Sequence, residues 1–266
     1  MQTAKVTEHI VAWLKEYATK ANCKGFVIGI SGGIDSAVTS TLCAKTGMTT
    51  LCVEMPIHQN QSQEIRGKTH IEWLKNSFEN VDSLAVDLSE TFDALSGVLP
   101  QTSNFERRDL SLANTRARLR MTSLYYMAGI RGFLVAGTGN KVEDFGVGFY
   151  TKYGDGGVDL SPIADLLKSE VKELASYLSI DSSVVNAAPT DGLWGDDRTD
   201  EDQLGATYLE LEWAMQKYDL NEPAENFVGR EREVFEIYTK LHRSNLHKMR
   251  PVPICIIEKE LRNNVN

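Results

Sequence analysis

The feature that most constrains the fold is a glycine-containing loop that directly follows a short apolar run. Residues 26–30 read Phe-Val-Ile-Gly-Ile, the pattern of a strand buried in a parallel sheet. Residues 31–36 continue as Ser-Gly-Gly-Ile-Asp-Ser and lead into a helical stretch that ends at Gly47. Glycines let the backbone turn tightly and approach a ligand, and a helix start offers free N–H groups to an anion. The strand, loop and helix together predict a phosphate-binding loop.

Strands alternate with helices through the first half of the chain. Apolar spacing and turn residues predict helices at 3–20, 61–75 and about 110–128, and further strands at 50–55, 83–88 and 132–136. This alternation predicts a doubly wound parallel sheet flanked by helices on both faces. Ligands of such sheets bind beyond the carboxyl ends of the strands, so the loops after Ile30, Met55, Leu88 and Ala136 are candidates for the site.

The second half of the chain has a looser pattern. Residues 139–160 are glycine-rich and predicted to be irregular, residues 189–205 are predicted to form an acidic loop, and helices are predicted at 168–178, 205–217 and 228–243. A basic segment follows the last of these helices. Because no repeat, low-complexity tract or flexible linker interrupts the chain, residues 1–266 are predicted to form a single domain with a helical C-terminal extension.

Composition excludes several classes of protein. The chain has no apolar stretch of eighteen residues and no secretory signal at its N-terminus. A net charge of −9 argues against a nucleic-acid partner. Of the four cysteines, Cys43, Cys52 and Cys255 lie in apolar runs and are predicted to be reduced core thiols. We therefore expect a cytoplasmic protein that does not interact with membranes.

The loop also carries a carboxylate, Asp35, which would repel a phosphate unless a divalent cation lies between them. The Gly-Lys-Ser/Thr ending of a Walker A loop and the GxGxxG pattern of dinucleotide folds are both missing. The remaining alternative is a structural glycine turn in which Asp35 or Ser36 only caps the helix.

The Ser-Gly-Gly-Ile-Asp-Ser run resembles the signature of the N-type ATP pyrophosphatases, whose fold is adenine nucleotide alpha hydrolase-like. The resemblance implies cleavage of ATP between its α and β phosphates, with pyrophosphate held in this loop and the substrate adenylated.

Three further runs resemble the NAD synthetases within that group. They are Asn-Thr-Arg-Ala-Arg-Leu-Arg-Met at 114–121, Gly-Thr-Gly-Asn-Lys-Val-Glu at 137–143 with Thr-Lys-Tyr-Gly-Asp-Gly-Gly-Val-Asp at 151–159, and Pro-Thr at 189–190 with Thr-Asp-Glu at 199–201. The resemblance extends over residues 25–253. The chain departs from the family by one extra residue between Glu143 and Lys152, and by Asp191 and Gly192 where the family often has Ala-Asp. We assign no role to Asp191 or to residues 144–150.

The resemblance implies roles for individual side chains. It implies ATP contacts for Gly29, Ile30, Ser31, Gly32, Gly33, Ile34, Asp35, Ser36, Thr138, Lys168 and Thr190. It implies deamido-NAD contacts for Arg118, Lys152, Asp159, His247 and Lys248, the last two in a segment expected to close over the substrate. It also implies Mg²⁺ ligation by Asp35 and Glu143. No residue is assigned as a nucleophile or a base.

The function implied is ATP-dependent amidation of deamido-NAD to NAD through an acyl-adenylate, which makes the chain a ligase. About twenty-five residues precede the first strand, too few for an amidase domain, so ammonia is the expected nitrogen donor, either free or supplied by a separate protein. The family implies a homodimer. The alternatives are another N-type pyrophosphatase, such as an XMP-amidating synthetase subunit, or a nucleotide-binding regulator without turnover.

Overall fold

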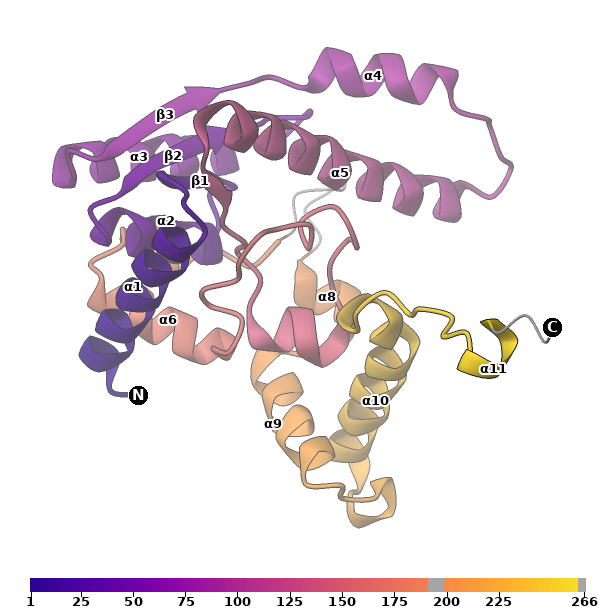
Figure 1. Ribbon diagram of the computed structural model, residues 1–266. Helices are drawn as coiled ribbons and strands as arrows, with labels where there is room; N and C mark the ends of the chain where they lie inside the picture. Colours follow the sequence, from indigo (N-terminus) through magenta and orange to yellow (C-terminus); the bar gives the residue numbers. More distant parts are fainter. Residues whose placement is uncertain (191–198, 263–266) are drawn as a thin grey trace.

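A computed structural model describes residues 1–190 and 199–262, so Asp191, to which no role was assigned, lies outside the described residues. Four parallel strands form one sheet in the order β3-β2-β1-β4 (Figure 1). Their bounds are Gly25–Gly29 for β1, Thr49–Glu54 for β2, Val81–Ala85 for β3 and Leu134–Val135 for β4. In the register, Val27 lies between Leu51 and Val135. The parallel sheet predicted from the sequence is confirmed.

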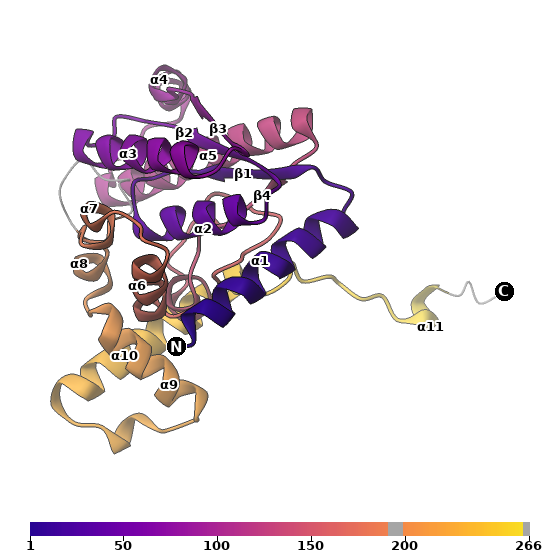
Figure 2. The same cartoon turned by 90° about the vertical axis from the view of Figure 1, so that its left-hand side faces the viewer.

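Helices cover both faces of this sheet, as predicted. On one face Phe26 and Ile28 of β1 pack with helices α1 (Thr3–Lys20), α2 (Ile34–Lys45), α3 (Gln61–Ser77) and α6 (Lys168–Tyr177). On the other face Val27 packs with α4 (Ser89–Val98) and α5 (Phe105–Arg131). Figure 2 shows α1 and α2 side by side along the first face. Alternate residues of one buried strand thus supply two separate cores.

The predicted bounds of two strands were wrong. The strand expected at 132–136 has only two residues, because Gly132 takes a left-handed conformation (φ 67°) as the C-cap of α5. The strand expected at 83–88 covers 81–85 instead, and Leu88 becomes the N-cap of α4. Both carboxyl ends nevertheless lie at the expected edge of the sheet.

A helical region follows the sheet and has its own core. It contains the π-helical turn η1 (Lys141–Val147), α8 (Asp200–Leu204), α9 (Tyr208–Asp219), the 3₁₀ turn η2 (Ala224–Asn226) and α10 (Gly229–Met249). The short helix α7 (Ser182–Val185) joins α6 to this region. Figure 1 shows α9 and α10 running together away from the sheet. The helical C-terminal part is confirmed, but residues 141–147 are helical rather than irregular, and α8 replaces part of the acidic loop.

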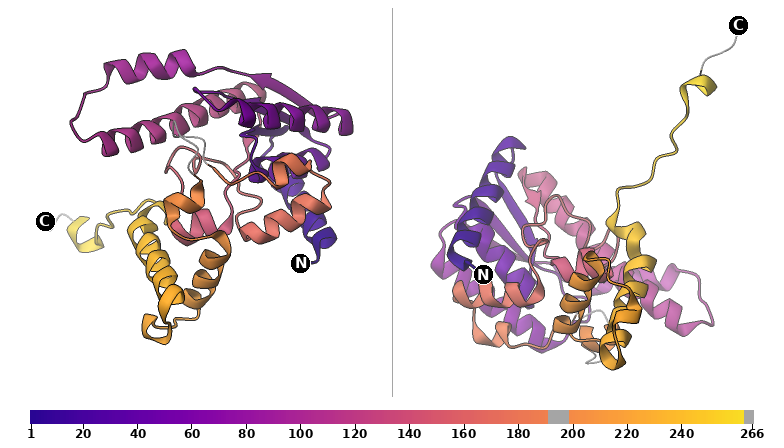
Figure 3. Two further views of the ribbon diagram at one scale, coloured as in Figure 1. Left: turned by 180° about the vertical axis from the view of Figure 1, so that it is seen from behind. Right: turned by 90° about the horizontal axis from the view of Figure 1, so that it is seen from below.

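Beyond α10 the chain runs away from the body to the short helix α11 (Lys259–Arg262) (Figure 3). Val252, Ile254 and Ile256 are 61%, 83% and 84% exposed along this tail. Cys255 is also exposed, so its assignment to the core was wrong, whereas Cys43 and Cys52 are buried. An apolar run alone does not bury a side chain, because burial requires another element to pack against it. Among the described helices, none has the length and apolar character that a membrane span requires.

Candidate active site

The phosphate-loop candidate joins β1 to α2 at the carboxyl edge of the sheet. Gly32 has φ +78°, and a Cβ atom there would lie 2.3 Å from the backbone oxygen of Gln63 on α3. Only glycine satisfies both the conformation and the close approach. Arg66, also on α3, donates from Nε to the oxygen of Gly32 at 3.2 Å. The loop is therefore held by α3, a helix on which the sequence reasoning placed no role.

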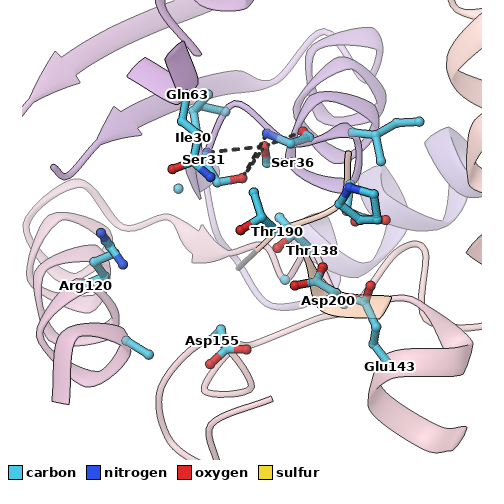
Figure 4. Close-up of a pocket in the computed structure, with 18 of the residues that line it drawn as sticks. Ile30, Ser31, Ser36, Gln63, Arg120, Thr138, Glu143, Asp155, Thr190 and Asp200 are labelled. Atoms are coloured by element: carbon cyan, nitrogen blue, oxygen red, sulfur yellow. Dashed lines mark hydrogen bonds between the residues drawn. The ribbon is translucent and has the colours of Figure 1, made fainter. Parts of the chain in front are cut away.

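Two serine hydroxyls fix the shape of the loop. Ser36 donates from Oγ to the oxygen of Gly33 at 2.9 Å, and the backbone N–H of Gly33 donates to Ser31 Oγ at 3.2 Å. The two hydroxyl oxygens lie 3.1 Å apart (Figure 4). Gly33 is the N-cap of α2 and provides no side chain to cap it. Gly33, Ile34 and Ser36 line the cleft, so the start of α2 and the positive end of its dipole lie beside it, which suits a phosphate.

Three charged side chains from three separate elements meet below this loop. Lys168, the first residue of α6, places its Nζ 2.5 Å from Oδ2 of Asp35 on α2 and 2.9 Å from Oε1 of Glu143 on η1. The Lys168 side chain is 4% exposed, and the two carboxylates are 17% and 16% exposed. The structure thus brings together the residue pair predicted to bind metal and the lysine predicted to bind phosphate.

The charges in this cluster perturb one another. Burial alone would lower the pKa of Lys168, but attraction to Asp35 and Glu143 outweighs burial and raises that pKa. Burial alone would raise the pKa of Glu143, yet Lys168 and a hydrogen bond from Tyr208 hold it below its usual value. For Asp35 burial dominates and raises the pKa. The cluster holds one cation and two acidic groups, and so favours a further positive charge.

Tyr208 was missed by the sequence reasoning. Its hydroxyl lies 2.5 Å from Oε1 of Glu143 and 3.2 Å from Oδ2 of Asp200, and its ring centroid is 4.9 Å from the Nζ of Lys168. Tyr208 is 3% exposed. In the sequence Tyr208 is only the first residue of an ordinary helix, seven residues after Glu201. A position of this kind does not reveal contacts with distant parts of the chain.

Asn140 was also missed, although it lies within the run at 137–143 that resembles the family. Asn140 is completely buried and caps η1, because its Oδ1 accepts from the backbone N–H of Glu143 at 3.1 Å. Its Nδ2 donates to Oδ1 of Asp35 at 3.3 Å. One amide therefore links the Asp35 carboxylate to the backbone of Glu143. Single-turn π-helices occur often at functional sites, and this one aims Glu143 into the cleft.

One cleft at the carboxyl edge of the sheet contains almost the whole predicted ATP set (Figure 4). Its lining includes Gly29, Ile30, Ser31, Gly33, Ile34, Asp35, Ser36, Thr138, Lys168 and Thr190, together with Glu143, and lacks only Gly32. Arg120, Gln63 and Asp155 line the same cleft without having been predicted. Burial raises the pKa of Asp155 to about 6.

The predicted deamido-NAD residues do not line this cleft. Arg118 donates from Nη2 to the oxygen of Lys152 at 3.3 Å, and Lys152 donates from Nζ to the oxygen of His247 at 2.6 Å. Lys248 donates to the oxygens of Gly148 and Tyr150 at 2.8 and 2.9 Å. These cations form a second cluster that joins α5, the loop after η1 and α10. Residues 149–158 border both regions, so the second cluster lies next to the cleft.

One expectation for this second cluster needs correction. The segment carrying His247 and Lys248 is the last turn of α10, not a loop beyond a helix ending near His242. A Cβ at Gly148 (φ +67°) would lie 2.4 Å from Cβ of Asn245, so α10 can pack this closely against the loop only because residue 148 is glycine. The Asp159 carboxylate is engaged by protein groups, accepting from the Tyr125 hydroxyl at 3.0 Å and the Val135 N–H at 2.8 Å.

A parallel sheet with a Ser-Gly-Gly loop at its carboxyl edge, and an Asp–Glu–Lys cluster beside that loop, agree with the class that the sequence resembles, the N-type ATP pyrophosphatases. The chain belongs to the NAD synthase family, because the profile of that family, described as NAD synthase, matches residues 6–252.

Individual relatives agree with this assignment. The chain is 42% identical over 207 residues to the NH(3)-dependent NAD(+) synthetase of Carboxydothermus hydrogenoformans, covering 77% of this chain and 82% of that protein. It is similar in structure to NMN synthetase from Francisella tularensis, with a TM-score of 0.81, 30% identity and coverage of 97% and 99%. It is also similar to NH3-dependent NAD synthetase from Campylobacter jejuni, with a TM-score of 0.77, 25% identity and coverage of 96% and 100%.

Proposed function

We propose that the protein is a ligase that amidates deamido-NAD to NAD with ammonia, using ATP as co-substrate. The observation that carries the proposal is the cleft that is lined both by the Ser31–Ser36 loop and by Lys168 and Glu143, which meet Asp35 of that loop. Membership of the NAD synthase family supports the substrate assignment. The family match does not favour the alternative of an XMP-amidating subunit.

The reaction proceeds in two steps. A carboxylate oxygen of the nicotinate group attacks the α-phosphorus of ATP, and the bond to the β-phosphate oxygen breaks, releasing pyrophosphate. Ammonia then attacks the acyl carbon and loses a proton. The bond between the acyl carbon and the phosphate oxygen breaks, and AMP leaves with the electrons of that bond. The Ser31–Ser36 loop and the start of α2 would bind the leaving pyrophosphate, and Lys168 would neutralise it. No protein nucleophile is required, because adenylation activates the carboxylate.

We also propose Mg²⁺ as a cofactor, held by Asp35 and Glu143. The fit rests on the donor set: two carboxylates from different loops already flank a cationic nitrogen, and phosphate oxygens would complete an all-oxygen shell. Within residues 1–190 and 199–262, no group of three or more His, Cys, Asp or Glu side chains could hold a metal. A bound Mg²⁺ would supply charge neutralisation at the phosphates.

The second cluster is the proposed binding region for deamido-NAD. Arg118, Lys152 and Lys248 place positive charge beside the cleft, next to His247, where a dinucleotide pyrophosphate could bind. Asp159 would contribute through a carboxylate that also positions Tyr125.

The proposed working form is a cytoplasmic homodimer that accepts free ammonia or ammonia from a separate protein. Exposed apolar side chains support self-association: Phe105, Tyr126 and Ile130 on α5 are 72%, 69% and 66% exposed.

The test is an assay with ATP, Mg²⁺ and ammonium in which deamido-NAD and XMP are supplied in parallel. We expect NAD, AMP and pyrophosphate only with deamido-NAD. Glutamine in ammonia-free buffer should not replace ammonium with the purified chain. Turnover of XMP alone, or no product with deamido-NAD, would contradict the proposal.

A second substrate is worth including in the same assay. Because a protein named NMN synthetase shares the fold over 97% of this chain, the deamidated mononucleotide is the second candidate. We expect a higher kcat/KM for the dinucleotide, since the Arg118–Lys152–His247 cluster extends the cationic surface beyond the cleft. A higher kcat/KM for the mononucleotide would assign the chain to that reaction instead.

The metal role is tested by Asp35→Asn, which keeps the size of the side chain and removes its charge. We expect NAD formation to fall by at least about a hundredfold, a loss of roughly 2.7 kcal/mol in transition-state stabilisation. Circular dichroism of the variant should match the wild type. A variant that keeps more than about a tenth of the wild-type rate at saturating Mg²⁺ would exclude Asp35 as a ligand.

A further inference from the structure

Lys168 occupies the position that a metal ion needs. Its Nζ lies within 2.9 Å of one carboxylate oxygen on Asp35 and one on Glu143, the same two groups proposed to bind Mg²⁺. Oδ1 of Asp35 accepts from Asn140, and Oε1 of Glu143 also faces the Tyr208 hydroxyl. An ion cannot bind both carboxylates through these oxygens while the ammonium remains between them.

Lys168 also cannot leave the carboxylates without another anion to receive it. Its side chain is 4% exposed, and a buried ammonium without a counter-charge is costly. The cleft offers one direction for such a move, because Lys168 lines it together with Ser31, Gly33 and Ser36 of the phosphate loop. The lysine side chain has a flexible stem of four carbons, so rotation about its bonds can move the ammonium while the backbone of α6 stays in place.

We propose that Lys168 is a resident counterion that holds the metal position until a metal–nucleotide complex arrives, and that it then transfers to the nucleotide phosphates. This inference rests on the proposed function and adds an order of binding to it. The metal enters with the nucleotide rather than before it. Phosphate binding removes the ammonium from the carboxylates, the vacated oxygens accept the metal, and each event therefore favours the other.

The charge balance supports this exchange. With Lys168 in place the cluster carries one positive and two acidic groups, and an added Mg²⁺ would meet the ammonium at close range. With a triphosphate bound, the Lys168 ammonium pairs with the phosphates, and the carboxylates of Asp35 and Glu143 are left for the metal. Lys141 provides a natural comparison, because its Nζ pairs with Asp165 at 2.9 Å on the surface, where both side chains are solvated.

The experiment measures Mg²⁺ binding by calorimetry without nucleotide and again with saturating α,β-methylene-ATP, which the enzyme cannot cleave between those phosphates. Because a triphosphate itself binds Mg²⁺, a titration of Mg²⁺ into the analogue alone is subtracted from the second measurement. Wild type should bind free Mg²⁺ weakly and bind it at least about a hundredfold more tightly with the analogue. Lys168→Met should bind free Mg²⁺ at least about tenfold more tightly than wild type, and should lose most of the gain from the analogue. Lys141→Met, the matched control, should behave as wild type.

A thermal melt of each variant shows whether it folds, and Mg²⁺ alone should raise the Tm of Lys168→Met more than that of wild type. Lys168→Gln serves as the second variant if Lys168→Met does not fold. Equal affinity for free Mg²⁺ in wild type and the folded Lys168 variant would overturn the inference. If neither variant folds, wild-type affinity for Mg²⁺ that does not change with the analogue would also overturn it.

The wild-type activity assay distinguishes failure of the counterion role of Lys168 from failure of the proposed function. Mg²⁺-dependent NAD formation together with unchanged metal binding in Lys168→Met would reject the counterion role alone. Absence of Mg²⁺-dependent NAD formation would reject the proposed function.

Discussion

At the scale of single residues, the cluster below the phosphate loop depends on a side chain outside every recognised motif. Tyr208 reaches from α9 to Glu143 on η1 and Asp200 on α8, so one hydroxyl joins three elements of the helical region. Its ring also lies beside Lys168. The position of Glu143 is therefore set by Asn140 from its own turn and by Tyr208 from across the cleft.

Tyr208→Phe removes this hydroxyl and leaves the ring in place. We expect the free energy of unfolding to fall by about 1–3 kcal/mol, because the carboxylates of Glu143 and Asp200 lose the single O–H group that lies between them. The Mg²⁺ concentration for half-maximal activity should rise as Glu143 loses its fixed position. Denaturant titration and a Mg²⁺ activation curve measure the two effects. Tyr177→Phe, on an exposed side chain, is the control, and identical behaviour of both variants would exclude a positioning role.

His70 makes stability depend on acid pH. It is 2% exposed, and its Nε2 lies 2.9 Å from Oγ of Ser40. Burial lowers its pKa from 6.5 to about 4. Between these two pH values the imidazole is therefore protonated in the unfolded state and neutral in the folded state. Its stabilising contribution is complete above pH 6.5 and is lost as pH falls towards 4, a change of roughly 3 kcal/mol.

Urea titrations between pH 7 and pH 4 test this dependence. His70→Gln should flatten the decline of unfolding free energy over this interval, whereas His9→Gln, on an exposed side chain, should leave it unchanged. A decline of the same slope in His70→Gln and wild type would assign the acid sensitivity to other groups.

At the scale of elements, the sequence predicted most of what local pattern determines. Helix α1 was predicted with its observed bounds, and α3 begins at the predicted Gln61, where Asn60 caps it by accepting from the Ser62 N–H. Gly47 has the positive φ expected just beyond α2. These features depend on neighbouring residues, so their signals lie within a few positions of each other.

Features that depend on contacts between distant elements could not be predicted. The π-helical turn at 141–147 is fixed by Asn140 and by packing against α9 and α10, not by a helical sequence pattern. The extension of α10 to Met249 places Lys248 where it binds the oxygens of Gly148 and Tyr150, 100 and 98 residues away. Resemblance to a family identified the motifs at 31–36, 114–121, 137–143 and 151–159, but it assigned no role to Tyr208 or Asn140.

The loop between β1 and α2 predicts a strong effect of one methyl group. Gly32→Ala should destabilise the protein by about 1–3 kcal/mol, because alanine at φ +78° is strained and its Cβ would meet the oxygen of Gln63. ATP affinity should fall as the loop shifts. Thermal melts and nucleotide titration measure both effects. Gly97→Ala, in α4 with open space around it, should be neutral or slightly stabilising. Equal ATP affinity in both variants would show that the loop shape is not needed.

At the scale of the whole molecule, the tail after α10 exposes apolar side chains. Val252, Ile254 and Ile256 alternate along an extended segment and are each more than half exposed. Exposed apolar side chains also lie on α5. Because contiguous exposed apolar surface marks sites of association, the tail should contribute to the proposed homodimer.

A chain that ends at Arg250 tests this contribution. We expect the full chain to sediment as a dimer and the shortened chain to dissociate at concentrations at least about tenfold higher. Lys248 and its bonds to the loop after η1 remain in the shortened chain, so its fold should be retained. Identical sedimentation of the two chains across the concentration range would exclude the tail from the interface.

The wide spacing of the charged cluster along the chain has a consequence during biosynthesis. Lys168 is 133 residues from Asp35, and Tyr208 is 65 residues from Glu143. A ribosome therefore releases the phosphate loop long before it releases the residues that complete the cluster. A nascent or prematurely terminated chain can form the first strands and helices but lacks this arrangement of charges. Fragments of the protein should consequently be unable to consume ATP wastefully in the cell.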